Sequence, residues 1–338
     1  MGALGLLLLV GVTLTLWWGG TRYATWTPAR PADSRHAEAD LSSDPVGPVA
    51  DVARRATRGV AIALVGGFWA GALVTGPAVR LIMRLLAATA GDDAQGRLTE
   101  ADEVVGRIEL GGTIGLYVFG GLLPGVLSGV IYLLLRRWLP TGRLGGVTLG
   151  ALHLVFAATR IDPLRPDNRD FELVGPGWLS VATFGLTCLL HGMAVVAIAN
   201  RYSHHLPPVT AGRADRLRAF VPLVPPVLLL VPGFPILLVL VAGIAITVAL
   251  SRVDGVVRAV RSRGTLLAGR LAIGVVALAF LPSTLVDLHD VIVRDEATSA
   301  RATFPDGHLP SPLWGTRNCA FMVSVPEGTT VRAACRSG

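Results

Sequence analysis

Long runs of apolar residues fill most of this chain, and short charged stretches separate them. A helix needs about 20 apolar residues to cross roughly 30 Å of hydrocarbon. The runs that meet or approach this length are Met1–Trp18, Gly59–Val79, Gly111–Leu135, Leu144–Thr159, Gly177–Ala199 and Thr265–Leu285. The pattern predicts an all-α fold, namely a polytopic transmembrane helix bundle.

A further apolar stretch, residues 219–250, is interrupted by five prolines. Each proline removes a backbone donor and clashes with the preceding helical turn. We therefore predict two unequal helical pieces that turn at residues 231–235, of which the first re-enters the membrane with its irregular backbone shielded by protein. One broken helix is the open alternative. The expected bundle has about seven spans plus this re-entrant or broken segment.

The polar stretches divide the chain into four parts. Residues 1–20 form an N-terminal transmembrane anchor, because they lack the basic start and the cleavage site of a secretory signal. Residues 21–56 are rich in proline and charge and form a cytoplasmic linker, largely disordered apart from a short helix before the membrane. Residues 57–290 make the helix bundle, and residues 291–338 a polar extracytoplasmic tail.

The chain of 338 residues is 52% hydrophobic and 16% charged, whereas soluble globular chains carry about 25% charged residues. This composition excludes an ordinary water-soluble domain. All 30 basic residues are arginine, which excludes the chemistry that depends on a lysine, such as Schiff bases and the P-loop. We predict no nucleic-acid partner, because the arginines stand at the ends of apolar runs rather than along one binding stripe.

The distribution of arginine predicts the orientation of the chain. If Met1 lies outside and residues 219–250 form a hairpin, 17 arginines fall on inner segments and 12 on outer ones. Basic residues next to transmembrane helices favour the cytoplasmic side. We therefore expect a multi-pass protein of the bacterial inner membrane whose N-terminus and C-terminal tail are both extracytoplasmic.

The tail contains two cysteines in a symmetric arrangement. Cys319 and Cys335 lie at equal distances from Glu327, where Glu327-Gly328 predicts a β-hairpin turn. The symmetry places the two cysteines opposite each other, and a disulfide between them would add about 3 kcal/mol. Because disulfides form in oxidising compartments, this hairpin agrees with an outer tail. Two unpaired thiols are the alternative.

Small residues recur every four positions on three of the predicted spans. In lipid such faces let helix backbones approach closely and so drive packing. We expect them to be packing surfaces rather than the lining of a pore. They are Gly67 and Gly71; Gly121, Gly125 and Gly129; and Gly146 and Gly150.

Two arginines and a glutamate suggest a site for an anion or a lipid headgroup at the outer surface. Arg80 and Arg84 are four residues apart and so share one helix face. Glu109 begins the next span at a similar height. A structural ion pair, or anchoring of the arginines at the interface, is the alternative.

A second set of polar residues lies within the predicted spans. His153 and His191 are each about 12–14 Å from the inner ends of antiparallel neighbouring spans, so their imidazoles are expected at the same depth. Cys188 shares a helix face with His191, and such a set suits a metal or a proton relay. Two separate hydrogen-bonded imidazoles are the alternative. Arg270, in the last span, either extends to the inner surface or marks an intramembrane polar site.

Other chemistry is weakly indicated. Asp287, His289 and Asp290 end the last span and suit either a cation or pH-sensitive site or a solvated helix end. The sequence lacks nucleophile-elbow, dinucleotide, Walker and metalloprotease motifs. Ser128 lies in Gly-Val-Leu-Ser-Gly, which has the wrong spacing for an elbow, although a Ser128–His191 dyad is conceivable. We predict no catalytic residue and no cofactor, and leave a bound metal open.

The stretches around Arg80-Leu-Ile-Met-Arg84, Glu109-Leu-Gly-Gly-Thr113 and residues 168–178 together resemble uncharacterised multi-pass integral membrane proteins of high-GC bacteria. The resemblance covers roughly residues 55–200 and implies a membrane location, with no activity attached.

The polar groups concentrate at the predicted outer face, while the mid-plane is almost free of charge. This favours a non-enzymatic structural or sensory envelope component, whose partners are the lipid bilayer and either an envelope protein or a second copy of the chain. A secondary transporter for a small solute and a membrane-embedded enzyme are the alternatives, the first because discontinuous helices form transport sites.

Overall fold

The computed structural model describes residues 2–24, 48–206, 220–230, 234–250, 252–253, 258–259 and 262–303. The described residues are mostly helical, with no β-strand among them, so the all-α expectation is confirmed. The α-helices are α1 (Gly2–Trp18), α2 (Pro48–Ala70), α3 (Gly76–Thr89), α4 (Leu110–Tyr117), α5 (Leu123–Leu135), α6 (Arg143–His153), α7 (Gly177–His205), α9 (Val224–Leu230), α10 (Phe234–Leu250) and α12 (Arg263–Thr303).

Two π-helical turns join consecutive α-helices into longer rods, and a third extends α6. They are η1 (Gly71–Thr75) between α2 and α3, η3 (Val118–Leu122) between α4 and α5, and η4 (Leu154–Ala158) after α6. Short 3₁₀ turns are η2 (Asp92–Ala94), η5 (Arg169–Glu172) and η6 (Val221–Leu223).

Four helical segments are long and apolar enough to cross a membrane: Val52–Thr89, Leu110–Leu135, Gly177–His205 and Arg263–Val293. Gly2–Trp18, Arg143–Ala158, Val221–Leu230 and Leu240–Leu250 are shorter apolar helices. The chain therefore has the helices of a membrane protein. The expected count of about seven spans exceeds the four that satisfy length and hydropathy.

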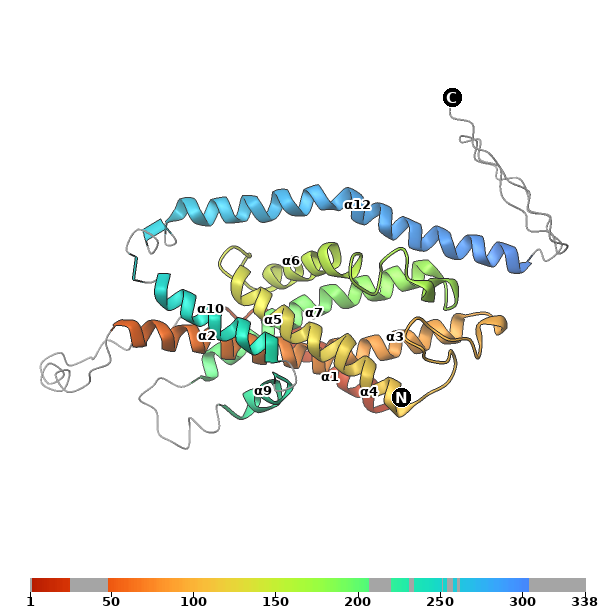
Figure 1. Cartoon of the computed structure of the whole chain (residues 1–338), viewed down its shortest axis with the longest axis horizontal. Coiled ribbons are helices and arrows are strands. Elements are labelled where there is room, and N and C mark those ends of the chain that lie inside the picture. Colours follow the sequence, from red (N-terminus) through yellow and green to blue (C-terminus); the bar gives the residue numbers. More distant parts are fainter. Residues whose placement is uncertain are drawn as a thin grey trace, which may run out of the picture.

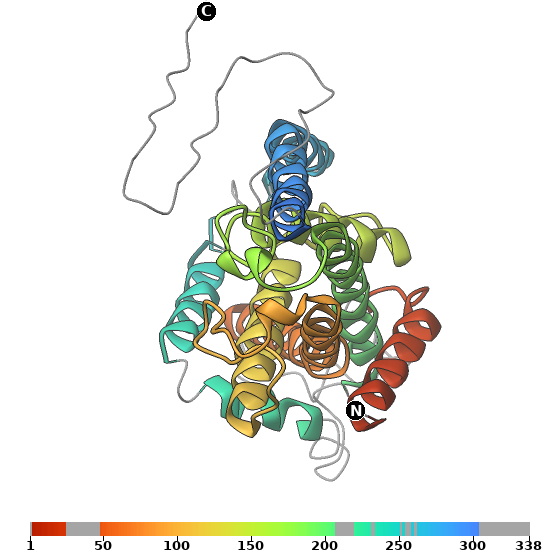
Figure 2. The same ribbon diagram turned by 90° about the vertical axis from the view of Figure 1, so that its right-hand side faces the viewer.

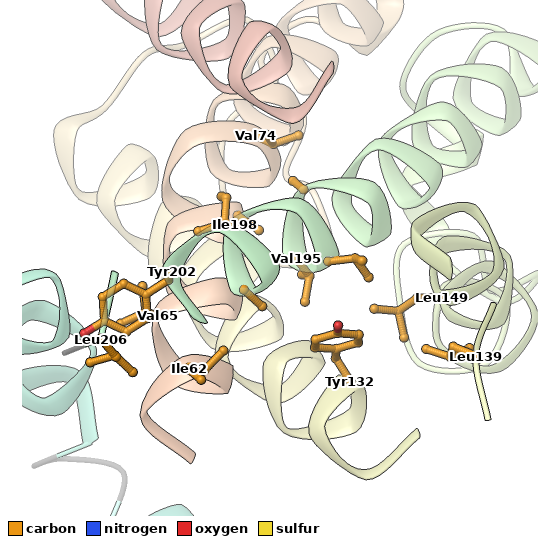
Figure 3. Packing of buried hydrophobic residues seen from close by; sticks show 14 residues of the cluster. Ile62, Val65, Val74, Tyr132, Leu139, Leu149, Val195, Ile198, Tyr202 and Leu206 are labelled. Atoms are coloured by element: carbon orange, nitrogen blue, oxygen red, sulfur yellow. The ribbon is translucent and has the colours of Figure 1, made fainter. Parts of the chain in front are cut away.

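Helix α7 lies at the centre of the bundle and packs against α1, α2, α5, α6 and α12. Figure 2 views the bundle nearly end-on, with α1 and α10 on opposite sides and α12 standing apart from the centre. The largest buried cluster brings together Ile62, Tyr132, Leu149 and Val195 from four different helices, as Figure 3 shows. Because α7 contacts these five helices, its side chains decide how the other helices are arranged around it.

Glycines bring pairs of helices into backbone contact. A Cβ atom placed on Gly125 would lie 2.5 Å from the carbonyl oxygen of Gly67, and Gly71 meets the backbone of Gly121 in the same way. Between α6 and α7, Gly150 and Gly192 approach so closely that neither position has room for a side chain. The predicted small-residue faces are thus the contact surfaces of α2 with α5 and of α6 with α7.

One end of the bundle carries a folded cap, made of residues 90–109 and 159–176. Its two loops are tied together: Asp170 accepts a hydrogen bond from the Glu100 amide at 2.7 Å, and Arg165 binds the Glu100 carboxylate at 2.5 Å. Leu164 and Phe171 are buried beneath them. The cap is thus an ordered surface rather than two separate loops.

The opposite end, which we call the arginine end, is closed by contacts to the C-terminus of α7. Asn200 donates to the Thr21 carbonyl at 2.8 Å, and Ser203 accepts from the Ala24 amide at 2.8 Å. Arg58 donates to the carbonyls of Ser203 and Leu206, which the helix leaves without intrahelical partners. These bonds fix residues 21–24, the first part of the predicted linker, against the bundle.

The Pro-rich stretch forms two separate helical pieces, α9 and α10 (Figure 1), and both pack against α2. Leu230 of α9 and Leu240 of α10 are buried in one cluster with Leu64 and Val126. Of the turn predicted at 231–235, the last two residues begin α10. Residues 231–233, the linker residues 25–47 and the tail residues 304–338 lie outside the described residues. The predicted Cys319–Cys335 disulfide and its β-hairpin are therefore outside them too, and no disulfide is found among the described residues.

Candidate functional site

The most polar feature of the bundle interior is a chain of four hydrogen-bonded side chains that we call the tetrad: Thr75, His191, Ser128 and His153. Ser128 Oγ lies 2.8 Å from His191 Nε2 and 2.9 Å from His153 Nε2. His191 Nδ1 lies 2.6 Å from Thr75 Oγ1. The two imidazole rings meet edge to face, with centroids 5.6 Å apart. The tetrad therefore links the four central rods of the bundle.

Local irregularities place the tetrad side chains. Thr75 is the last residue of η1, and His153 is the residue immediately before η4. A π turn shifts the helix face by one residue and often marks a functional position. The neighbouring glycine contacts bring these rods close enough for short side chains to bond across them.

The number of available protons restricts how the tetrad is bonded. The Ser128 hydroxyl holds one proton, so it donates to one imidazole and accepts from the other. If it donates to His153, His191 donates from Nε2 and accepts the Thr75 hydroxyl proton at Nδ1. The proton on His153 Nδ1 then faces the Leu149 carbonyl, without a regular hydrogen bond. In the opposite arrangement, Nδ1 of His153 carries a lone pair that faces the Leu149 carbonyl oxygen, and two acceptors that face each other repel. Donation from Thr75 to His191, from His191 to Ser128 and from Ser128 to His153 is therefore favoured, with both imidazoles neutral.

The structure brings His153 and His191 together but leaves Cys188 and Arg270 out of the hydrogen-bonded network. Arg270 is an exposed residue of α12, where it lines a shallow hollow with Trp138 and Thr148. Among the described residues no cluster of three His, Cys, Asp or Glu side chains is placed to hold a metal. The expected set of His153, His191 and Cys188 is thus met by the two histidines alone, and Arg270, the separate candidate, lies on an exposed face of α12.

A second candidate site is a cleft of about 390 Å³ between α3 and the cap. Arg80 and Arg84 of α3 form one side, and Glu103 and Arg107 of the cap form the other. The expected pairing of these arginines with Glu109 does not occur, since Glu109 binds Arg107 at 3.1 Å and is not part of the cleft. The cap loop folds back over α3. As a result Glu103, rather than Glu109, lies opposite Arg80.

The three polar residues at the end of the last span are separated. Asp287 is held by Arg160 at 3.8 Å, and Arg160 also donates to Ser283 at 2.6 Å. His289 and Asp290 are exposed on α12. These contacts attach α12 to the cap, so Asp287 has a structural role in this arrangement.

The carboxyl of Asp170 makes the cap sensitive to pH. Burial raises its pKa above the usual value, and the Glu100 carboxylate adds to the shift, while the Glu100 amide and Arg165 oppose it. A raised pKa means that the folded cap holds this proton more tightly than the unfolded chain does, so the cap gains stability as pH falls. We expect hydrogen exchange of residues 95–108, corrected for intrinsic rates, to slow from about pH 7 to about pH 4.5. An equal change in the Asp170→Asn variant would contradict this assignment.

Sequence reasoning named the two histidines and a Ser128–His191 pair, but it missed that Ser128 also bonds to His153 and that Thr75 bonds to His191. The only available signal for Ser128 was a hydroxyl within an otherwise apolar run. It also missed the bond from the Tyr132 hydroxyl to Asn200 Oδ1, 2.7 Å long, which joins α5 to α7 near the arginine end.

Comparisons with known proteins add no relative. Neither protein-family models, nor curated proteins, nor solved structures provide a match to this chain. The resemblance to multi-pass proteins of high-GC bacteria therefore stays a prediction, and function has to be inferred from the geometry described above.

Proposed function

We propose that this chain is a non-enzymatic structural or sensory component of the bacterial cell envelope, held in the cytoplasmic membrane, which presents its cap at the outer surface. One observation carries the proposal: the buried polar side chains of the described residues include no Asp, Glu or Arg. The proposal invokes no cofactor and no nucleic acid. The partners of the chain are the bilayer and either an envelope protein or a second copy of the chain.

The closed state of the tetrad supports a role without catalysis. Ser128 and His191 are 3% and 5% exposed, and neither of the two hollows described above is lined by a tetrad residue. A nucleophile needs access to its substrate and donors that stabilise the developing oxyanion. Ser128 instead uses its hydroxyl to join two imidazoles, which is the behaviour of a structural connection.

The proposed orientation sets the number of crossings. If both ends of the chain lie outside, the number of full crossings is even. The rods that begin with α1, α2, α4, α6, α7 and α12 provide six, and α9 with α10 re-enters from the arginine end. The expected count of about seven spans, which did not include the Pro-rich segment, is then one too high.

Cysteine labelling in intact cells tests this orientation. In a chain whose native cysteines are replaced by serine, Asp102→Cys places a thiol on the exposed cap, and Arg201→Cys places one at the arginine end. We expect a membrane-impermeant maleimide to label the first variant in intact cells and the second only after permeabilisation. The reverse pattern would overturn the proposal, and a reporter fused after Gly338 gives an independent check of the same orientation.

A secondary transporter that moves protons is the second candidate function. The observation that favours it is the tetrad itself, since histidine side chains within a membrane take part in proton relays and here two of them are joined by hydrogen bonds through Ser128. A transporter must admit water to such a chain at some stage of its cycle. Labelling of His153→Cys that changes with an imposed pH gradient would favour this candidate over the first.

A further inference from the structure

We propose that the cleft between α3 and the cap binds a phosphate group, carried by an anionic lipid headgroup or by a free phosphate ester. The inference names a ligand for the cap and rests on the proposed function only for the location of the cleft at the outer surface. It is carried by the juxtaposition of Arg80 and Arg84 on one helix face with a hollow of about 390 Å³ that both side chains line.

The arrangement of charge in the cleft calls for an anion. Arg80 and Arg84 are one helical turn apart, and their positive charges repel each other. The Nε atom of Arg80 is buried and has no hydrogen-bond partner among the described residues. A buried donor without a partner indicates an ion or a water that belongs there.

Two acidic residues lie near the cleft, and each already has a positive partner. Glu109 is paired with Arg107 on an exposed surface. Glu103 attracts Arg80, but its carboxylate is packed against Gly112 in the first turn of α4, where the helix N-terminus also stabilises negative charge. The Glu103 carboxylate therefore interacts with both Arg80 and the N-terminus of α4, and the Nε atom of Arg80 still has no hydrogen-bond partner among the described residues.

The walls of the cleft identify the kind of ligand. Apart from the charged groups they consist largely of apolar side chains, among them Met83, Ala87, Val105 and Val174. Guanidinium groups match the oxygen geometry of phosphate and hold it by charge-assisted hydrogen bonds. A phosphate next to an apolar wall, at the height where a transmembrane helix leaves the lipid, fits the headgroup and glycerol of an anionic phospholipid.

Binding to the purified full-length chain in phosphatidylcholine nanodiscs tests the inference. The probes are phosphatidylglycerol, added at rising mole fraction and counted by native mass spectrometry, and soluble glycerol 3-phosphate. We expect saturable binding to the wild type, with retention of phosphatidylglycerol at least about tenfold weaker in the Arg80→Gln/Arg84→Gln variant. Arg97→Gln, which changes an exposed arginine of the cap outside the cleft, is the matched control and is expected to bind like the wild type.

A variant that gains binding protects the test against simple misfolding. Glu103→Gln removes the carboxylate that competes with the phosphate and is expected to strengthen binding several-fold. Saturation by glycerol 3-phosphate alone would identify a free ester as the ligand, and saturation by phosphatidylglycerol alone a lipid headgroup. The inference would be overturned if neither probe showed saturable binding, or if the wild type and the double variant bound equally well. Because nanodiscs expose both faces, this result is independent of the labelling experiment on orientation.

Discussion

Replacing Gly67 with alanine is expected to destabilise the bundle by about 1–3 kcal/mol, as overpacking of a close contact does. A methyl group at this position would overlap the carbonyl oxygen of Gly125 on the facing helix. Backbone atoms cannot move aside as a flexible side chain does, so α2 and α5 would have to separate. Leucine at the same position is expected to cost more, because a larger side chain enforces a larger separation.

A matched glycine gives the opposite sign. Gly115 lies within α4, and a Cβ atom built on it meets nothing within 4 Å. Gly115→Ala should therefore raise stability, by up to about 1 kcal/mol from helix propensity alone. Denaturant-induced unfolding in detergent micelles, followed by circular dichroism, measures both variants. If Gly67→Ala proves as stable as Gly115→Ala, the close contact between α2 and α5 is not present in the protein.

Removing the Ser128 hydroxyl is expected to cost about 2–4 kcal/mol, because it leaves two buried imidazole nitrogens without a partner and each such group costs about 1–3 kcal/mol. No other side chain of the tetrad bonds to both histidines. Thr75→Val removes only the terminal bond to His191 and should cost less. The difference between the two variants measures how far the tetrad acts as one unit, because networks of this kind are not additive.

Ser180 supplies the control for this substitution. It is 0% exposed, like Ser128 it is a serine within a helix of the bundle, and its hydroxyl has no hydrogen-bond partner among the described residues. Ser180→Ala is therefore expected to leave stability unchanged or to raise it slightly. Equal destabilisation by Ser128→Ala and Ser180→Ala would show that loss of volume, rather than loss of the tetrad bonds, is responsible.

The helical character of the chain, its long apolar rods and the break in the Pro-rich segment were all predictable from the sequence. Each follows from a local property, either a run of apolar residues or a proline that removes a backbone donor. The glycine faces were predictable for the same reason, since Gly67 and Gly71, and Gly121 and Gly125, each lie one helical turn apart. Gly192 was missed, because it has no partner glycine four residues away on its own helix.

The depth of His153 and His191 also followed from the sequence, through the rise of 1.5 Å per residue. Their contact did not, since depth says nothing about the direction in which a side chain points. Two π turns and the glycine contacts rotate and draw the rods together until the Ser128 hydroxyl lies between the two rings. The same reasoning paired Arg80 with Glu109, and it failed because the cap loop folds back and places Glu103 at the cleft.

The sequence by itself determined what each segment is: an apolar rod, a helix break, a charged end. Hydropathy and helix periodicity are properties of neighbouring residues, so they need no knowledge of the fold. Only the tertiary structure decided which faces meet, which hydroxyl joins the two imidazoles, and which acid lies opposite Arg80. Those contacts depend on the rotation of each rod and on how closely two backbones approach, and residues far apart in the chain set both together.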